Sequence, residues 1–151
     1  MPDAVAQSAD KDAKASPSLL YLIKRTEQVV RARLEQVLKP AGVTALQYTA
    51  LTVLLRHDGL TAAQLARDSF VTAQSMADMV RTLEARGYVV RRSNPANRRE
   101  LLIELTQDGR QLLARYEQPV RELENRMTAG LTAVQSDSLR AALDHTWRQL
   151  S

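Results

Sequence analysis

Two helix-start signals that lie close together constrain the fold more than any other feature of the chain. Thr61 begins a Thr-x-x-Gln string that ends at Gln64, and this pairing is typical of a capping box at the start of a helix. The first helix is expected to end near Asp68, and after a four-residue break Thr72 is a second N-cap. The second helix is expected to end at Gly87. A short helix, a tight turn and a longer helix predict a helix-turn-helix motif.

A predicted β-hairpin follows this motif directly. Apolar residues alternate from Leu101 to Leu105, which is the period of a half-exposed strand, and the polar segment 94–97 provides a turn. Arg98 and Arg99 lie at the tip of the hairpin. A basic hairpin after a helix-turn-helix is suited to extend its arginines toward phosphates or into the minor groove. The sequence therefore predicts a mainly α-helical fold with a winged helix-turn-helix.

The helix that follows Thr72 is amphipathic. Met76, Met79, Val80 and Leu83 share one side and polar side chains share the other. Such a helix can read the major groove when its apolar face packs on a supporting helix, and glutamine, serine and arginine all suit base or phosphate contacts. A merely solvated polar face is the alternative, and the basic hairpin favours the DNA interpretation. The predicted DNA contacts are Thr61, Gln64, Thr72, Gln74, Ser75, Asp78, Arg81, Asn97, Arg98 and Arg99.

Amphipathic helices at both ends of the chain need a surface to cover their apolar stripes. Packing within one chain is one alternative. We prefer a homodimer, because helix-turn-helix proteins gain affinity and a half-site spacing of about 34–36 Å by pairing. The predicted dimer residues are Leu19, Leu22, Ile23, Leu139, Leu143, Trp147 and Leu150.

The composition excludes several other classes of protein. The chain has no cysteine, so disulfides, thiolate nucleophiles and CxxC metal sites are ruled out. It also has no Gly-rich phosphate loop, HExxH or GxSxG string, and His57 and His145 are too isolated to suggest a metal site. The net charge is only +4, but residues 81–99 hold six arginines and one acid. We expect no enzyme activity, metal or cofactor, and a polyanionic partner.

The chain is expected to form one domain over residues 17–150, with dimerisation helices at 17–39 and 107–150 and a DNA-binding lobe at 44–105. Residues 1–16 are polar and lack the apolar run of a secretory signal, which predicts a disordered tail. No apolar stretch approaches the roughly 18 to 20 residues that a membrane helix needs. These observations predict a cytoplasmic protein with no membrane partner.

Four strings are specific in combination, order and spacing: VTALQYTAL at 43–51, TAAQLA at 61–66, LEARGYVVR at 83–91, and NPANRR at 94–99 followed by Leu105 and Thr106. With them the chain resembles MarR-type transcriptional regulators over about residues 18–150. The resemblance implies a homodimer with interlocked end helices, two winged lobes that read a pseudo-palindrome in double-stranded DNA, and often a small effector between dimer helices and lobe.

The chain departs from the family pattern at two positions. The wing of the family usually carries Asp-x-Arg, in which the acid supports the arginine, whereas this chain has Asn97 before Arg99. Position 78 is often basic in the family and is Asp78 here, and an acid that faces phosphate is repulsive. Asp78 is expected either to orient Arg81, three residues further along the helix, or to accept from cytosine N4.

The predicted function is a sequence-specific DNA-binding transcriptional regulator, and the resemblance implies a repressor that a small-molecule effector releases. A winged-helix protein-interaction module with weak or no DNA binding is the alternative, which Asp78 and Asn97 keep open. An aromatic or anionic effector would find rings and cations near apolar faces. Ordinary surface or snorkelling roles are the alternative for each of these residues. The predicted pocket residues are Tyr21, Arg25, Tyr48, Arg56 and Tyr116.

Overall fold

The computed structural model describes residues 15–151, so the tail predicted over residues 1–16 lies outside the described part except for its last two residues. The chain divides into two compact units, one that ends at Ala32 and one that runs from Arg33 to Ser151. In the described part of the first unit, Ser18 Oγ accepts a hydrogen bond from the backbone N–H of Tyr21 at 3.1 Å, which caps the first helix.

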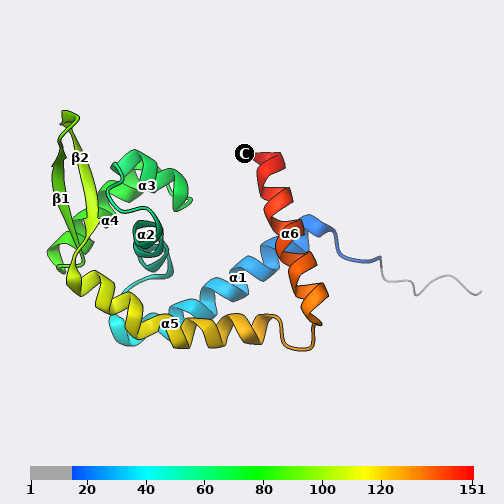
Figure 1. The fold of residues 1–151 in the computed structure, drawn as a ribbon. Helices are drawn as coiled ribbons and strands as arrows, with labels where there is room; N and C mark the ends of the chain where they lie inside the picture. Colours follow the sequence, from blue (N-terminus) through cyan, green and yellow to red (C-terminus); the bar gives the residue numbers. More distant parts are fainter. Residues whose placement is uncertain (1–14) are drawn as a thin grey trace, which may run out of the picture. The chain divides into compact units, whose positions relative to one another are not determined.

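The described chain is mainly helical, with a two-stranded antiparallel sheet (Figure 1). This agrees with the predicted fold class. In order along the chain, the elements are α1 (Leu19–Leu38), a short 3-10 helix (Lys39–Ala41), α2 (Ala45–Arg56), α3 (Ala62–Asp68), α4 (Ala73–Ala85), β1 (Val89–Asn94), β2 (Asn97–Leu105), α5 (Gln107–Met127) and α6 (Ala133–Leu150).

Threonine side chains begin most of these helices. Thr44, Thr61 and Thr132 form complete capping boxes with the glutamines three residues later, and the box at Thr61 is the one predicted above. Thr72 and Thr106 cap α4 and α5 by accepting a backbone N–H three residues further on. Each cap pairs a backbone donor that the helix itself leaves free, so the sequence sets where these helices start.

The hydrophobic core of residues 33–151 is shared by α2, α3, α4, the hairpin and α5, together with Leu38. Leu51, Leu65, Met76, Leu83 and Ile103 are all almost completely buried. The apolar side of α4 faces this core as predicted. Because α4 is packed on its apolar side, its polar side is held outward on a rigid support.

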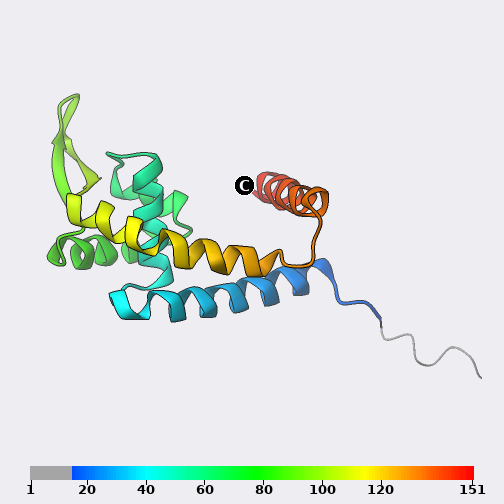
Figure 2. The same cartoon turned by 60° about the horizontal axis from the view of Figure 1, so that its bottom comes forward.

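The hairpin extends beyond α3 and α4 in both views (Figures 1 and 2). The strands pair from Val89 with Leu105 to Ser93 with Leu101, and Asn94 then pairs with Asn97. The base of the hairpin gains a third backbone segment, since the Ile103 N–H donates to the carbonyl of Leu60 at 2.7 Å. The predicted wing is therefore present and is fixed at its base.

Helix α5 is fastened to the base of the wing by a close contact and an ion pair. A Cβ atom built at Gly109 would lie 2.3 Å from the carbonyl oxygen of Tyr88, so only glycine fits there. Asp58 accepts hydrogen bonds from the Leu105 N–H at 3.1 Å and from the Arg110 guanidinium at 2.7 Å. These contacts couple the position of the wing to the start of α5.

Candidate nucleic-acid interface

The outward face of α4 consists of small polar and charged side chains. Four side chains that were predicted to lie on this face are all exposed: Gln74, Ser75, Asp78 and Arg81. At the start of the helix, Thr72 Oγ1 accepts the Ser75 N–H at 3.1 Å and lies 3.0 Å from the Ser75 hydroxyl. The first turn of α4 therefore presents two hydroxyl groups and the Gln74 amide together.

Asp78 and Arg81 form an ion pair on the same face of α4. The guanidinium of Arg81 donates to Asp78 Oδ1, as one of the two roles expected for Asp78 requires. Both side chains remain more than half exposed, so the pair is screened by solvent and contributes little to stability. Its effect is to cancel charge on this face and to hold the guanidinium beside the carboxylate.

Two more arginines of the basic window are paired with acids. Arg91 Nε donates to Glu84 at 2.6 Å, and this hydrogen bond raises the pKa of the Arg91 guanidinium. Arg92 forms an ion pair of 2.8 Å with Glu104 on the opposite strand. Glu104 lies outside the window that the sequence analysis counted, so the basic charge at the base of the wing is smaller than the composition suggested.

Arg86 is occupied by the protein backbone. Its guanidinium donates to the carbonyl oxygen of Ala41 at 2.7 Å and to that of Gly42, and it stacks over the ring of Tyr88 at 5.2 Å from the centroid. These contacts join the end of α4 to the segment before α2. Arg86 therefore has a structural role that local sequence spacing does not reveal.

The tip of the wing holds the remaining arginines of the window, Arg98 and Arg99. Among residues 15–151, neither side chain forms an ion pair with an acid. The strand register shifts between Ser93 and Asn94, so residues 98–100 have no paired residue on β1. Arg86 also has no acid partner within residues 15–151, but its guanidinium is held by backbone carbonyls, so Arg98 and Arg99 are the arginines of the window that are left for an outside partner.

Asparagine side chains shape the turn at the tip. Asn94 Oδ1 accepts the Ala96 N–H at 3.0 Å, and Asn97 Oδ1 accepts the Arg99 N–H at 3.2 Å. Asn97 therefore supports the backbone of Arg99, whereas the aspartate of the family pattern would support the guanidinium. Glu100 accepts from the Asn94 amide at 3.1 Å, which places one acid close to the arginines.

The remaining predicted DNA contacts, Thr61 and Gln64, lie at the start of α3. Thr61 Oγ1 accepts the Gln64 N–H at 3.3 Å, and Gln64 Oε1 accepts the Thr61 N–H at 3.0 Å. The capping box thus uses the amide oxygen of Gln64. Its amide NH₂ group is the part left for an outside partner.

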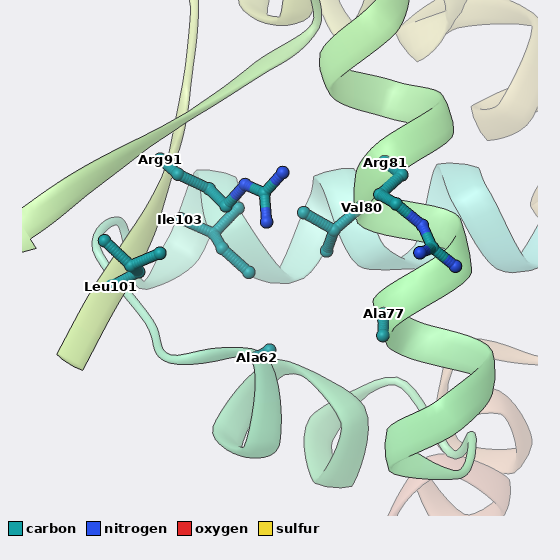
Figure 3. A pocket seen from close by; sticks show the side chains of 7 residues that line it. All are labelled: Ala62, Ala77, Val80, Arg81, Arg91, Leu101 and Ile103. Atoms are coloured by element: carbon teal, nitrogen blue, oxygen red, sulfur yellow. The ribbon is translucent and has the colours of Figure 1, made fainter. Parts of the chain in front are cut away.

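A small hollow lies beside α4. It has a volume of about 200 Å³, and its walls are mostly apolar with two guanidinium groups at its sides (Figure 3). Ala77 and Arg81 belong both to this hollow and to the exposed side of α4. The lining residues are Ala62, Ala77, Val80, Arg81, Arg91, Leu101 and Ile103.

The residues predicted to hold an effector differ in how exposed their side chains are. Tyr48 and Tyr116 are buried in the hydrophobic core, whereas Arg56 is exposed. Burial raises the pKa of the Tyr48 phenol, and the nearby charge of Glu117 raises it further. Tyr21 and Arg25 are exposed in the unit that ends at Ala32.

The residues predicted to form the dimer are all exposed. The four on α6 cover one stripe along a helix that has no buried residue. The exposed fractions are 78% for Leu19, 41% for Leu22, 43% for Ile23, 45% for Leu139, 50% for Leu143, 52% for Trp147 and 85% for Leu150.

The turn between α3 and α4 contains features that the sequence analysis did not single out. Phe70 has a positive φ of 60° and is 71% exposed, and the hydroxyl of Ser69 is buried with no hydrogen-bond partner in the described chain. The sequence did contain a signal for this feature. Phe70 stands in the turn of a helix-turn-helix, where the backbone often needs a positive φ and glycine is the residue that suits it.

Residues 15–151 contain no cluster of three or more His, Cys, Asp or Glu residues that could hold a metal ion. None of their helices has both the length and the apolar character to cross a membrane.

Comparison with known proteins identifies the family. A model of the MarR family matches residues 41–100. The HTH-type transcriptional repressor Rv2887 of Mycobacterium tuberculosis is 36% identical over 124 residues, which are 82% of this chain and 89% of that protein. The same Rv2887 protein, solved in complex with salicylic acid, matches with a TM-score of 0.70 and 35% identity over 87% of this chain and 98% of that one.

Two solved structures of Escherichia coli MarR extend this comparison. The apo form matches with a TM-score of 0.76 and 26% identity over 87% of this chain and 98% of that chain. A cysteine-to-serine mutant in complex with operator DNA matches with a TM-score of 0.77 and 27% identity over 85% of this chain and 92% of that chain. These relatives are DNA-binding regulators and not enzymes, in agreement with the expected class. The chain belongs to the MarR family of winged helix-turn-helix transcriptional regulators.

Proposed function

We propose that this protein represses transcription by binding, as a homodimer, to a pseudo-palindromic operator, and that a small aromatic or anionic effector releases it. The observation that carries the proposal is the combination of a rigidly supported polar helix face on α4 with a wing whose Arg98 and Arg99 have no acid partner within residues 15–151. The first surface suits base edges and the second suits phosphates.

In this proposal α4 enters the major groove, and its N-terminal turn lies closest to the base edges. The Gln74 amide offers a donor and an acceptor side by side, which matches adenine. The hydroxyls of Thr72 and Ser75 can donate to or accept from base edges and phosphates. Thr61 and Gln64 at the start of α3 are proposed to contact the DNA backbone, because the capping box leaves the side-chain NH₂ group of Gln64 free to donate to a phosphate.

Asp78 is proposed to act through Arg81. The ion pair cancels the repulsion that a lone carboxylate would meet near phosphate, and it fixes the guanidinium relative to the helix. A guanidinium held in this way can pair with guanine, while the free carboxylate lone pairs can accept from cytosine N4. Specificity at this position would then depend on both side chains.

The wing is proposed to follow the DNA backbone beside the groove that α4 reads. Arg98 and Arg99 would contact phosphates or enter the minor groove, and Asn97 would hold the backbone that carries them. Because these contacts are with phosphate, they add affinity for every sequence and make that affinity fall with salt.

The proposed dimer covers the apolar stripes of the end helices. Leu139, Leu143, Trp147 and Leu150 leave a row of apolar surface on α6, and Leu19, Leu22 and Ile23 leave another at the start of α1. A helix exposed all round is not stable by itself, and a partner chain supplies the missing cover. Pairing also places two α4 helices for two half-sites.

The effector part of the proposal rests on the salicylic acid complex of Rv2887 and on the chemistry of this chain. The predicted pocket residues remain Tyr21, Arg25, Tyr48, Arg56 and Tyr116. The hollow beside α4 is a second place where a small aromatic acid would find apolar walls and guanidinium groups. An acid bound there would compete with DNA, because Ala77 and Arg81 belong to both surfaces.

A selection of bound sequences from random duplexes tests the proposal. We expect a pseudo-palindrome whose half-sites lie about one helical turn or a multiple of it apart, and salicylate is expected to reduce binding to it. Enrichment of no sequence would favour a protein-interaction module instead. Since the organisms of these relatives are bacteria, in which operator DNA lies in the cytoplasm, we also place the protein there.

A further inference from the structure

Phe70 occupies an unfavourable position in the turn between α3 and α4. Its backbone is in the left-handed region with a φ of 60°, which an aromatic residue rarely adopts, and its ring is 71% exposed to solvent. Within residues 61–87 it is the one large apolar side chain that is exposed. A glycine at this position would remove both the backbone strain and the exposed ring.

The turn holds the ring outward. Ser69 on one side is completely buried, and Val71 on the other side is half-buried against the core. The backbone N–H of Val71 donates to Ala66 at 3.2 Å, and that of Phe70 donates to Arg67 at 3.4 Å. With both neighbours anchored, the Phe70 side chain has no inward alternative.

A second unfavourable feature lies in the same turn. The Ser69 hydroxyl is buried and has no hydrogen-bond partner within the described residues. Unfavourable backbone and polar groups collect where function requires them, since elsewhere a more stable residue would serve. Two such features in adjacent residues therefore mark this turn as a functional element.

The place of Phe70 indicates its partner. It precedes the N-cap Thr72 by two residues, and Gln74 and Ser75 follow in the first turn of α4. The exposed ring therefore lies next to the turn of α4 that is proposed to enter the major groove. In that groove thymine alone presents a methyl group, and an apolar side chain such as phenylalanine is suited to contact it.

We propose that Phe70 contacts a thymine methyl group in each operator half-site and so contributes to sequence specificity. The inference rests on the proposed function, because it requires the start of α4 to lie in the major groove. Contact with the methyl group covers the exposed ring only in the DNA complex. The strained backbone and the exposed ring of Phe70 make the free protein less stable, and this loss is offset only when the protein binds its operator.

The test replaces thymine with deoxyuridine, which lacks only the methyl group, at each position of the selected duplex in turn. For the unchanged protein we expect one symmetric position per half-site at which affinity falls about fourfold, the effect of removing one buried methyl-sized group. Phe70→Gly is expected to bind the thymine duplex more weakly and to lose the sensitivity at that position. Leu55→Ala, which removes another exposed apolar side chain of the lobe, is expected to keep the profile.

A measurement of thermal unfolding shows whether the weaker binding expected of Phe70→Gly comes from a loss of folding. Phe70→Gly is expected to unfold at a higher temperature than the unchanged protein, because the strain is relieved, so weaker binding cannot be attributed to misfolding. A flat deoxyuridine profile, or an unchanged profile in Phe70→Gly, would overturn the role of Phe70 while leaving operator binding intact. Absence of binding to every duplex would overturn the proposed function itself.

Discussion

Asp78 accepts a hydrogen bond from Arg81 one turn further along α4, so the centre of the proposed reading face carries a balanced pair of charges. The pair restrains the guanidinium and also limits nonspecific attraction to phosphate. We therefore expect the protein to bind random DNA more weakly and to discriminate better between sequences than it would without the pair.

Asp78→Asn tests this relationship. The free Arg81 guanidinium is expected to bind phosphate, so random duplexes are bound more tightly and the salt slope steepens by about one unit per half-site. The ratio of operator to random affinity is expected to fall. Fluorescence anisotropy at several salt concentrations measures both quantities. Glu124→Gln makes the same charge change on α5 and is the control; equal behaviour of the two variants would show that Asp78 has no special role.

Gln74→Ala and Arg99→Ala separate base reading from phosphate binding. Gln74→Ala is expected to cost about 1–3 kcal/mol at one base position only. Arg99→Ala is expected to weaken all duplexes alike and to flatten the salt slope by about one unit per half-site. Arg115→Ala removes the same charge from α5 and is expected to do neither. If the first two variants behaved alike across a panel of mutated operators, the assignment of separate roles to α4 and wing would be wrong.

Leu143→Asp combined with Trp147→Ala tests the proposed dimer. An aspartate in the exposed apolar stripe of α6 would be buried without a partner in a dimer interface, so the double variant is expected to be monomeric. Analytical ultracentrifugation measures the mass, and operator binding is expected to be lost with the dimer. A variant that still sediments as a dimer would place the interface on another surface.

Gly109→Ala tests the junction between the wing and α5. The added methyl group would lie 2.3 Å from the carbonyl oxygen of Tyr88, so the helix must shift, and we expect a loss of about 1–3 kcal/mol in the free energy of unfolding. Urea denaturation measures the loss. Gln111→Ala, at an exposed site two residues further along the same helix, is expected to have little effect. Equal stability of the two variants would contradict the close contact.

The local features of the fold were predictable from the sequence. Thr44, Thr61 and Thr132 begin helices because their capping partners lie three residues away, and the inward position of Met76 and Leu83 follows from helical spacing. The Asp78–Arg81 pair was one of the two roles expected for Asp78, since residues three apart share a helix face.

Contacts between distant segments were not predictable in the same way. Arg86 binds the carbonyls of Ala41 and Gly42 only because the fold brings two segments together. The pairing of Arg92 with Glu104 depends on the strand register, which no local signal defines. The pairing with Glu104, which lies outside residues 81–99, is one reason why a window with six arginines carries less unbalanced charge than its composition suggested.

The salt dependence of binding to the selected duplex tests the central claim most directly. Arg98 and Arg99 supply four guanidinium groups in a dimer, so the logarithm of the affinity is expected to fall against the logarithm of salt concentration with a slope of about −3.5 or steeper. A double variant, Arg98→Ala with Arg99→Ala, is expected to lose most of that slope. A slope near zero, or no binding to any duplex, would contradict the account of this protein as an operator-binding repressor.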